Sequence, residues 1–450
     1  MPELLHNAII INEGHRFKGW LFIDDAGRIG AIGEGEAPQH YFDDERVTVT
    51  DIQGRWLMPG VIDSHVHFRE PGLTHKATIY SESRAAAAGG VTSFMEMPNT
   101  NPPTVTLEAL AQKQQIAAKD SAVNYSFFIG ATNDNVDVLK QVDYTQVPGV
   151  KLFMGSSTGG MLVDGSEALE QIFSLPGVIM AHCEDEAIVR ENMQRTKQLY
   201  PQGDAPLSWH PEIRSALACF ASTARAVELA KKHDARLHVA HITTAEELEL
   251  FEAADGKLTC EICVAHLTFT DEDYATLGTR IKCNPSVKSK RHREALWQGI
   301  ADGKILTVST DHAPHTLQEK SAGTITAPSG MPMVQFSLPA MLNYALEGRL
   351  TPERVVELMC HNQAKLFRVE KRGYLRPGYW ADIVEVDPEQ ETIIEADSIL
   401  SQCGWSPLQG RRLRSRVLST RVNGRRVFEA GTPHPLLAET AGMPLRFRPE

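Results

Sequence analysis

Short apolar runs alternate with helix-like stretches through the middle of the chain, and this alternation most constrains the fold. Eight runs are largely apolar and mostly rich in β-branched or aromatic residues, which is typical of buried strands. They cover residues 60–67, 91–97, 124–130, 149–154, 178–183, 236–243, 258–267 and 305–311. Helix-like stretches lie between them, at 80–88, 107–119, 213–232, 245–254 and 291–301. Buried strands that alternate with helices predict a parallel sheet.

Eight such units favour a closed (β/α)8 barrel of the TIM type within an α/β protein. An open doubly wound sheet is the alternative, but no Gly-x-Gly-x-x-Gly follows any of the runs, which removes the main reason to prefer it. The chain ends instead hold short alternating segments with turn signals such as Asn423-Gly424. Because each end is too short to bury a good core, we expect both to combine into one small β-sandwich domain. The predicted organisation assigns 1–58 and 370–450 to this domain and 59–369 to the barrel.

Charge and composition exclude several classes of protein. The net charge of −12 argues against nucleic acid or an anionic membrane surface as a partner, since both favour clustered Lys and Arg. No apolar run approaches the roughly 20 residues of a membrane-spanning helix, and the start lacks the regions of a signal peptide, so we expect a cytoplasmic protein. The seven cysteines are odd in number and scattered, and we interpret Cys260 and Cys263 as buried structural thiols. A small anionic substrate would need a local cationic pocket.

The sharpest local signal is His65-Val66-His67, at the end of the first run. Residues two apart on a strand face the same side, so both imidazoles can point at one metal ion. His-x-His alone is a weak signal, but other candidate ligands lie in or at the ends of later runs. These are Lys151, His182, His241 and Asp311. The C-terminal ends of barrel strands open onto one face, so these side chains are expected to converge.

Imidazole and carboxylate groups suit zinc and similar ions, and an open coordination position would lower the pKa of a water molecule toward neutrality. The sequence therefore predicts a hydrolytic metal site. Lys151 would ordinarily be a lysine whose ammonium group reaches water. Here the apolar run 150–153 holds its amine inside the barrel beside cations, where the neutral form is favoured. A neutral lysine can react with carbon dioxide to give a carbamate, which can bridge two metal ions.

Three motifs resemble the amidohydrolase superfamily and, within it, the dihydroorotases. They are Asp-Ser-His-Val-His-Phe-Arg-Glu-Pro-Gly at 63–72, Met-Pro-Asn-Thr-Asn-Pro-Pro at 97–103 and Ser-Thr-Asp-His-Ala-Pro-His at 309–315. Residues 375–384 are similar to the closing β segment of the superfamily, so the resemblance covers nearly the whole chain. It implies the reversible cyclisation of N-carbamoyl-L-aspartate to dihydroorotate with loss of water, a step of pyrimidine synthesis.

The resemblance also implies roles for individual residues. The implied metal ligands are His65, His67, Lys151, His182, His241 and Asp311. The His-x-His pair and the aspartate would hold the more buried of two divalent ions, expected to be Zn²⁺. The other two histidines would hold the more exposed ion, the carbamylated lysine would bridge the two, and the aspartate would also shuttle a proton.

The resemblance implies substrate contacts as well, at Arg69, Asn99, Asn284, His315, Ser329 and Gly330. The arginine, the first asparagine and the histidine would bind the carboxylate of a small anionic substrate, and Ser329-Gly330 would belong to a loop that closes over the ring. A homodimer is expected by analogy.

One segment departs from the family pattern. Many longer bacterial dihydroorotases carry an aspartate shortly after the fourth strand, whereas residues 155–160 here contain no carboxylate. The bridge therefore falls on Lys151, as in allantoinases and dihydropyrimidinases, while the run 97–103 looks more like dihydroorotase than either relative. An allantoinase or hydantoinase activity stays open as an alternative. A non-catalytic scaffold for a carbamoyltransferase is disfavoured, because such scaffolds would be expected to have lost metal ligands.

Three other features have ordinary structural explanations. His238 lies three residues before His241, so we expect it to face the opposite side as a packed or helix-facing histidine. His266 ends the seventh run and could line the site or serve the structure. The basic run 288–293 begins a helix and is expected to be a solvated face.

Overall fold

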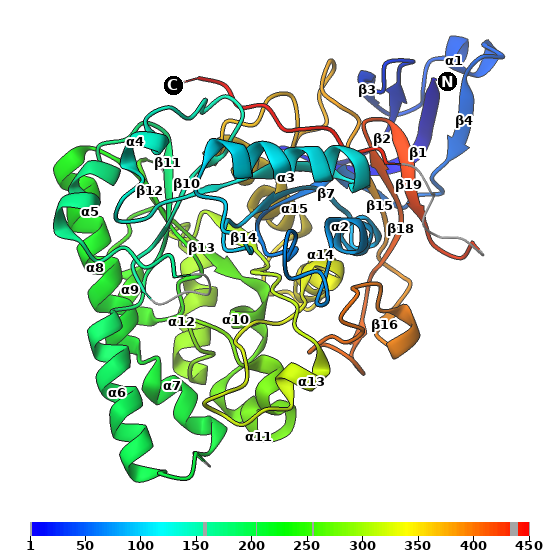
Figure 1. The fold of residues 1–450 in the computed structure, drawn as a ribbon. Coiled ribbons are helices and arrows are strands. Elements are labelled where there is room, and N and C mark those ends of the chain that lie inside the picture. The colour runs from blue at the N-terminus through cyan, green and yellow to red at the C-terminus, as the bar shows by residue number, and fades with distance from the viewer. Residues whose placement is uncertain (1, 156–159, 204, 254–255, 433–439, 450) are drawn as a thin grey trace.

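The computed structural model describes residues 2–155, 160–203, 205–253, 256–432 and 440–449. In Figure 1 the middle of the chain forms a body of strands covered by helices, and strands from both chain ends lie together at one side of it. Residues 156–159, where the sequence lacks the aspartate of many longer bacterial dihydroorotases, lie outside the described residues.

The parallel strands of the body match the eight predicted runs. They are β6 (Val61–Val66), β7 (Val91–Glu96), β8 (Asn124–Phe127), β9 (Ile129–Gly130), β10 (Gly149–Phe153), β11 (Val178–His182), β12 (Arg236–Val239), β13 (Leu258–Cys263) and β14 (Thr307–Ser309). The third predicted run is divided between β8 and β9. Ladders join them into two sheets, in the orders β14-β13-β12-β11-β10-β9 and β6-β7-β8. A parallel bridge between Val66 and His312 lies where the end of β6 meets the chain beyond β14.

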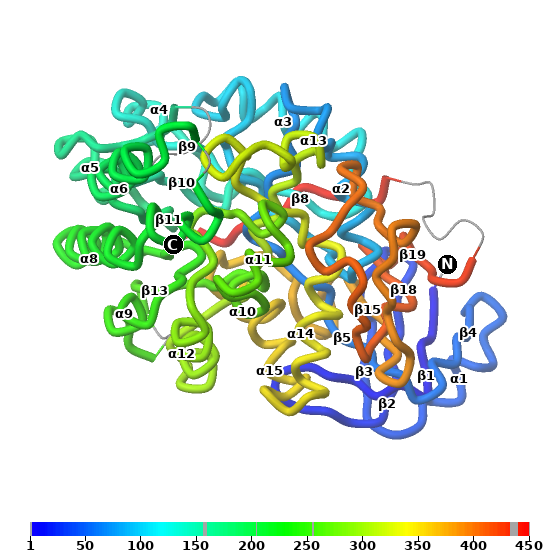
Figure 2. Tube along the Cα trace, turned by 90° about the horizontal axis from the view of Figure 1, so that it is seen from below, coloured from blue at the N-terminus to red at the C-terminus, as the bar shows by residue number. Residues whose placement is uncertain are grey.

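Helices follow most of these strands along the chain. Their bounds are α1 (Gln39–Asp43), α2 (Ile79–Ala88), α3 (Leu107–Asp120), α4 (Val136–Leu139), α5 (Ser166–Ile172), α6 (Glu186–Leu199), α7 (His210–Ile213), α8 (Ala216–His233), α9 (Ala245–Leu248), α10 (Val264–Thr268), α11 (Tyr274–Leu277), α12 (Lys290–Ala301), α13 (Leu317–Lys320), α14 (Ser337–Leu346), α15 (Pro352–Val356) and α16 (Asn362–Leu366). Figure 2 shows α5, α8, α9 and α12 on the outside of β10, β11 and β13.

Short turns complete the helical structure. They are the 3₁₀ helices η1 (Leu207–Trp209), η2 (Asp271–Asp273), η3 (Gly278–Ile281), η4 (Val334–Phe336) and η6 (Ala396–Ser398), and the π-helix η5 (Glu357–His361). Within the described residues, no helix combines the length and apolar character that crossing a membrane requires.

Local sequence signals explain where the helices begin. Thr78 caps α2 by accepting a hydrogen bond from the backbone of Ser81, and Ser215 caps α8 by accepting one from Ala218. Three predicted boundaries were wrong by four or more residues. The expected helix at 245–254 ends at Leu248 and the strand expected to reach 243 ends at Val239. The strand expected to reach 267 ends at Cys263, where α10 begins directly.

The chain ends build one small β domain, as predicted. Its strands are β1 (Glu3–Asn12), β2 (His15–Ile23), β3 (Ile29–Glu34), β4 (Thr48–Asp51), β5 (Trp56–Pro59), β15 (Ile383–Asp387), β18 (Arg416–Val422) and β19 (Arg425–Glu429). The order is β19-β18-β15-β5-β1-β2-β3, with β4 paired to β1, and the antiparallel pair of β15 with β5 joins the two ends. A separate pair is formed by β16 (Thr392–Ile393) and β17 (Arg412–Leu413). The boundaries near 58 and 370 stay a prediction.

Apolar side chains form a layer in the interior, away from the predicted ligands. Ile62, Met95, Phe128, Met180 and Ala240 are buried together in one cluster. These residues lie before the strand ends that carry the candidate ligands, so the chain packs this part of the interior tightly and leaves polar groups at the C-terminal ends.

A buried ion pair fastens the two chain ends to each other. Arg421 in β18 is fully buried and donates from Nε and Nη2 to the carboxylate of Glu3 in β1, at 2.9 and 2.8 Å. Burial alone would raise the pKa of Glu3, but the hydrogen bonds and charge of Arg421 outweigh it and lower the pKa below its ordinary value of 4.5. The ionised pair therefore stabilises the folded chain above that value, and its contribution is lost as pH falls through the lowered pKa.

We predict that Arg421→Met destabilises the protein at pH 7 by about 3 kcal/mol, because the Glu3 carboxylate loses its main partner in a poorly solvated place. The difference in Tm from the unaltered protein should shrink as pH falls below the ordinary pKa of Glu3, since protonation removes the stranded charge. Thermal unfolding across this pH range measures both effects. The control is Arg46→Met, which removes an exposed pair with Asp44 and should leave Tm nearly unchanged. An equal loss at every pH would contradict this explanation.

Candidate active site

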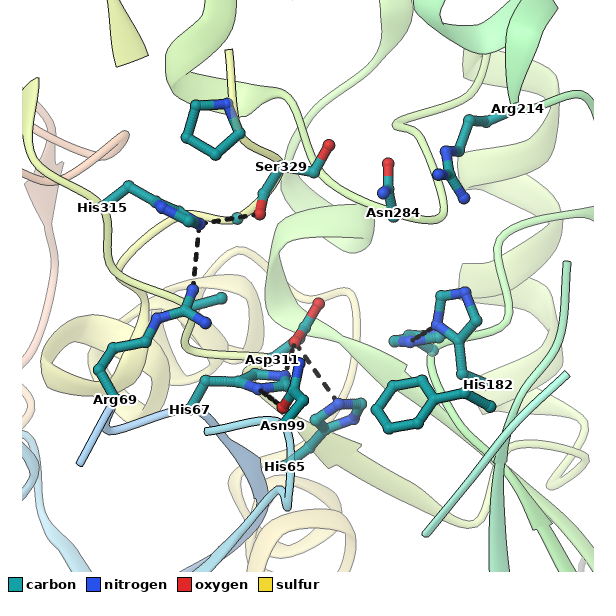
Figure 3. A pocket seen from close by; sticks show the side chains of 15 residues that line it. His65, His67, Arg69, Asn99, His182, Arg214, Asn284, Asp311, His315 and Ser329 are labelled. Carbon is teal, nitrogen blue, oxygen red and sulfur yellow. Dashed lines mark hydrogen bonds and ion pairs between the residues drawn. The ribbon is translucent and has the colours of Figure 1, made fainter. Parts of the chain in front are cut away.

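A cavity of about 300 Å³ opens at the C-terminal ends of the parallel strands. Every predicted site residue except Lys151 lines it, and Phe153, Arg214, Ala313 and Pro328 complete its wall. Figure 3 shows His65, His67, His182 and Asp311 in the lower part of the view, with Arg69 and His315 to one flank and Arg214 to the other. The structure therefore brings residues from distant parts of the sequence to one place.

Three site residues leave the ordinary strand conformation. Arg69, His241 and Asp311 have positive φ angles of 69°, 36° and 46°. Such backbone costs roughly 1–3 kcal/mol at a non-glycine residue and persists only where the surroundings enforce it. This backbone conformation makes each side chain depart from the alternating directions of the strand that precedes it. All three side chains line the cavity.

Asp311 lies between the two histidines of the His-x-His pair. Its Oδ1 is 3.0 Å from Nε2 of His67 and 3.4 Å from Nε2 of His65. Ligand atoms of His65, His241 and Asp311 lie within 4.8 Å of one another. Burial alone would raise the pKa of Asp311, but the neighbouring histidines lower it to about 2, so the group is a carboxylate.

The second histidine pair approaches from β11 and the turn after β12. Nδ1 of His182 lies 3.0 Å from Nε2 of His241, and both rings are buried. Nδ1 of His241 has no hydrogen-bond partner among the described residues. Burial lowers the pKa of both histidines, most strongly that of His241, and neutral imidazole is the form that binds metals.

Acceptors behind the rings fix which nitrogen faces the cavity. Nδ1 of His65 lies 2.5 Å from Glu261, and Nδ1 of His67 lies 2.8 Å from Oδ1 of Asn99. On the other side, Nε2 of His182 lies 3.0 Å from Glu184. A ring N–H that donates outward leaves the lone pair of the other nitrogen directed inward, which is the arrangement of metal-ligating histidines.

Lys151 lies in the interior, in β10, where it pairs with Met180 two residues before His182. Its side chain is completely buried, and its Nζ has no hydrogen-bond partner among the described residues. Burial lowers the pKa of Lys151 to about 8. A buried ammonium ion without partners is costly, whereas a carbamate on this nitrogen would supply an anionic ligand. The donor set of imidazoles, a carboxylate and this orphaned amine therefore fits a pair of divalent metal ions.

The opposite flank carries cationic and hydrogen-bonding groups. Arg69 donates from Nε to the carbonyl oxygen of Pro314 at 3.0 Å, and its Nη2 lies 3.1 Å from Nε2 of His315. Nε2 of His315 also lies 3.0 Å from the carbonyl oxygen of Ser329. Burial and the charges of Arg69 and Lys76 hold the pKa of His315 well below its usual range, so the ring is neutral. These contacts position the guanidinium group at the wall of the cavity.

The sequence reasoning missed Glu261, Glu184 and Arg214. Glu261 and Glu184 lie in or just after apolar runs, where a buried carboxylate is rare unless it is paired. That position was the available signal for both residues. Arg214 follows the short helix α7, in a region where no motif marks it.

The contacts of His238 and His266 show where these two rings lie. His238 is packed, but toward the interior rather than the helices, because Nδ1 lies 2.9 Å from Thr259 on the next strand and Nε2 lies 3.7 Å from Glu261. The left-handed backbone at His241 breaks the alternation of side-chain directions, which is why the expected orientation of His238 was wrong. His266 lies in α10 rather than at a strand end, and its Nε2 contacts the carbonyl oxygen of Pro285 at 3.1 Å.

The basic run is less solvated than expected. α12 begins at Lys290, and Lys288 and His292 are buried. The interpretation of Cys260 and Cys263 is confirmed, since both are buried free thiols.

Comparison with protein families matches residues 56–427 to the amidohydrolase family. The chain belongs to the amidohydrolase family. Members of this family are hydrolytic enzymes with a divalent metal centre, and the geometry of the site fits this chemistry. A dihydroorotase of Halobacterium salinarum is 38% identical over 390 residues, covering 86% of this chain and 88% of that protein. Relatives named dihydroorotase extend down to 30% identity.

Two other amidohydrolases are similar in different ways. An allantoinase of Rubrobacter xylanophilus is 32% identical over 393 residues, covering 85% of this chain and 86% of that protein. The solved structure of an L-hydantoinase (dihydropyrimidinase) from Arthrobacter aurescens superposes with a TM-score of 0.91 at 28% identity, covering 99% of each chain. This match supports the predicted class of a TIM-like barrel with a small β domain built from both ends.

Within this amidohydrolase site, we predict that Glu261→Gln weakens divalent metal binding by roughly 10- to 100-fold. The neutral amide is a poorer acceptor for the N–H of His65, so the ring becomes a less basic ligand. Competition with a chelator, followed by metal analysis, measures the change. Glu247→Gln is the control, because Glu247 is an equally buried carboxylate whose partners are Thr223, Thr243 and Thr244. Equal metal affinity in both variants would contradict the role of Glu261.

Proposed function

We propose that the chain is a dihydroorotase, which interconverts N-carbamoyl-L-aspartate and dihydroorotate in pyrimidine synthesis. The observation that carries this proposal is the buried Arg69 guanidinium beside His315, which lines the same cavity as the candidate metal ligands. A planar guanidinium group suits a carboxylate, and dihydroorotate carries one on its ring. The relatives named dihydroorotase, at 30–38% identity, support the same substrate.

The proposed metal centre holds two Zn²⁺ ions. His65, His67 and Asp311 would bind the more buried ion, His182 and His241 the more exposed one, and a carbamate on Lys151 would bridge them. Two such ions, when bound, supply a Lewis acid for the amide carbonyl and lower the pKa of the attacking water. The inward lone pairs of the histidines and the orphaned Nζ of Lys151 support this assignment.

The protein residues divide the remaining work between proton transfer and orientation. Asp311 is a carboxylate between two histidines, so its Oδ atoms can take the proton of the attacking water and deliver it to the departing ring nitrogen. Arg69, His315 and Asn99 would hold the ring carboxylate, and Asn284 would contact the ring. Ser329 and Gly330, in the loop that contacts His315, would cover it. In the reverse direction the same groups orient N-carbamoyl-L-aspartate for ring closure.

Allantoinase and hydantoinase activities are the competing assignments, since relatives with both names share the family or the fold. The decisive experiment is a substrate panel of dihydroorotate, allantoin and dihydrouracil with metal-loaded protein. Turnover of dihydroorotate alone is the expected result. Preferred turnover of either other ring would overturn the proposal. The homodimer stays a prediction.

We predict that Lys151→Ala abolishes nearly all activity and reduces the metal content below the expected two ions per chain, because the bridging ligand is lost. Metal analysis and steady-state kinetics measure the two effects, and mass spectrometry of the unaltered protein under native conditions tests for the carbamate. Lys119→Ala, at an exposed lysine in α3, is the control and should be silent. Full activity with two ions in Lys151→Ala would reject the bridge.

A second prediction concerns the carboxylate of the substrate. Arg69→Lys keeps the positive charge but removes the planar fork, so kcat/KM for dihydroorotate should fall at least tenfold, or about 1.4 kcal/mol in transition-state binding. Metal content should stay the same. Arg190→Lys, at an exposed position on α6, is the matched control. If Arg69→Lys and Arg69→Ala kept full activity with both ions bound, Arg69 would not anchor the carboxylate.

A further inference from the structure

The cavity has a second guanidinium group, on the flank opposite Arg69. Figure 3 shows Arg214 beside Asn284, across the cavity from Arg69 and His315. Both Arg214 and Asn284 line the cavity. The substrate contacts proposed above include the Arg69 flank and Asn284 but leave Arg214 without a role.

Two contacts hold the Arg214 segment against the Asn284 loop. Nε2 of His210 donates to the carbonyl oxygen of Cys283 at 2.8 Å, and the hydroxyl of Ser286 donates to the carbonyl oxygen of Arg214 at 3.0 Å. His210 is buried, and burial lowers its pKa to about 3, so this contact persists as a neutral ring. The chain before and after Asn284 is thus tied to the start and end of the segment 210–214, which brings Arg214 and Asn284 to the same flank of the cavity.

The hydrogen-bonding capacity of this pair is only partly used inside the protein. Arg214 donates from Nη1 to Glu184 at 2.6 Å, and the contacts of the described residues occupy no other guanidinium nitrogen. Oδ1 of Asn284 is buried and has no partner among those residues. The wall therefore presents a charged N–H donor beside an unsatisfied carbonyl acceptor.

We propose that Arg214 and Asn284 form a subsite for the ureido group, –NH–CO–NH–, of the substrate. An amide N–H of the ureide would donate to Oδ1 of Asn284, and its carbonyl oxygen would accept from the guanidinium of Arg214. This inference rests on the proposed function, because Arg69 holds the ring carboxylate at the other flank and the ureide is the remaining polar edge of the ring. A buried acceptor that stays unpaired is costly, so a ligand without the ureide should bind much more weakly.

Arg214 also neutralises Glu184, and a purely structural role must be separated from substrate contact. The charge of Arg214 and the hydrogen bond from His182 lower the pKa of Glu184 to about 2 against the opposing effect of burial. Arg214→Lys keeps a cation for Glu184 but lacks the second arm of the guanidinium group. Arg214→Met removes the cation as well.

The test compares two ligands that differ only in the ureido group. The KM of N-carbamoyl-L-aspartate and the inhibition constant of succinate are measured for the metal-loaded unaltered protein, Arg214→Lys and Arg214→Met. We expect Arg214→Lys to raise KM at least tenfold, to leave the inhibition constant of succinate within twofold and to keep two metal ions per chain. Arg190→Lys, at an exposed position, should change neither constant.

Two results would overturn the subsite. Unchanged KM in both Arg214 variants would show that no contact exists, and a parallel rise of both constants with loss of metal would assign Arg214 to the support of Glu184 alone. Failure of the proposed function looks different. If the unaltered protein hydrolyses another cyclic ureide but not dihydroorotate, the same comparison with that ureide decides the subsite independently. Absence of binding of every ureide to the unaltered protein, by calorimetry, would overturn both.

Discussion

The carboxylate of Glu261 is the group on which the arrangement of the site depends. It lies in β13, fully buried, and contacts Nδ1 of His65, the backbone N–H of His241 and the hydroxyl of Ser309. One side chain thus connects the ends of four parallel strands at the level of the candidate ligands. A buried charge survives only where donors surround it, and here the donors are the groups whose positions the chemistry requires. The apolar layer beneath keeps water out of the interior.

The local distribution of charge explains how an acidic protein can hold an anion. The net charge is −12, yet the cavity wall carries Arg69 and Arg214. Behind the loop at 325–330, the buried amines of Lys282 and Lys320 donate to its backbone carbonyl oxygens, including those of Ala327 and Gly330. Burial lowers the pKa of these lysines to about 8 and about 7. Arg214 is paired with Glu184, whereas Arg69 contacts a backbone carbonyl oxygen and His315, so the local charge at the Arg69 flank can favour an anion although the protein as a whole is acidic.

The sequence predicted the strands and the convergence of most candidate ligands at one cavity, because both depend on short-range pattern and on one topological rule. The same reasoning failed where a turn breaks the alternation of side-chain directions along a strand. His241 has a left-handed backbone, so its side chain does not follow this alternation and the predicted orientation of His238 was wrong. It failed at His266 because Cys263 and Val264 belong to one apolar run, and no glycine or proline separates β13 from α10. Glu261, Glu184 and Arg214 act through contacts with distant residues, so no local motif could identify them.

Substrate choice in this fold must come from the walls of the cavity. A TM-score of 0.91 with an L-hydantoinase at 28% identity shows that the scaffold is shared across activities, so the fold alone cannot select a substrate. If the Arg214 flank recognises a ureide, it accepts a group that dihydroorotate shares with hydantoins and allantoin. Only the Arg69 flank then meets a feature that dihydroorotate has and those rings lack, namely its carboxylate. The two arginines thus divide recognition into a class-wide part and a selective part, and exchange of substrate within the family should require change at the Arg69 flank.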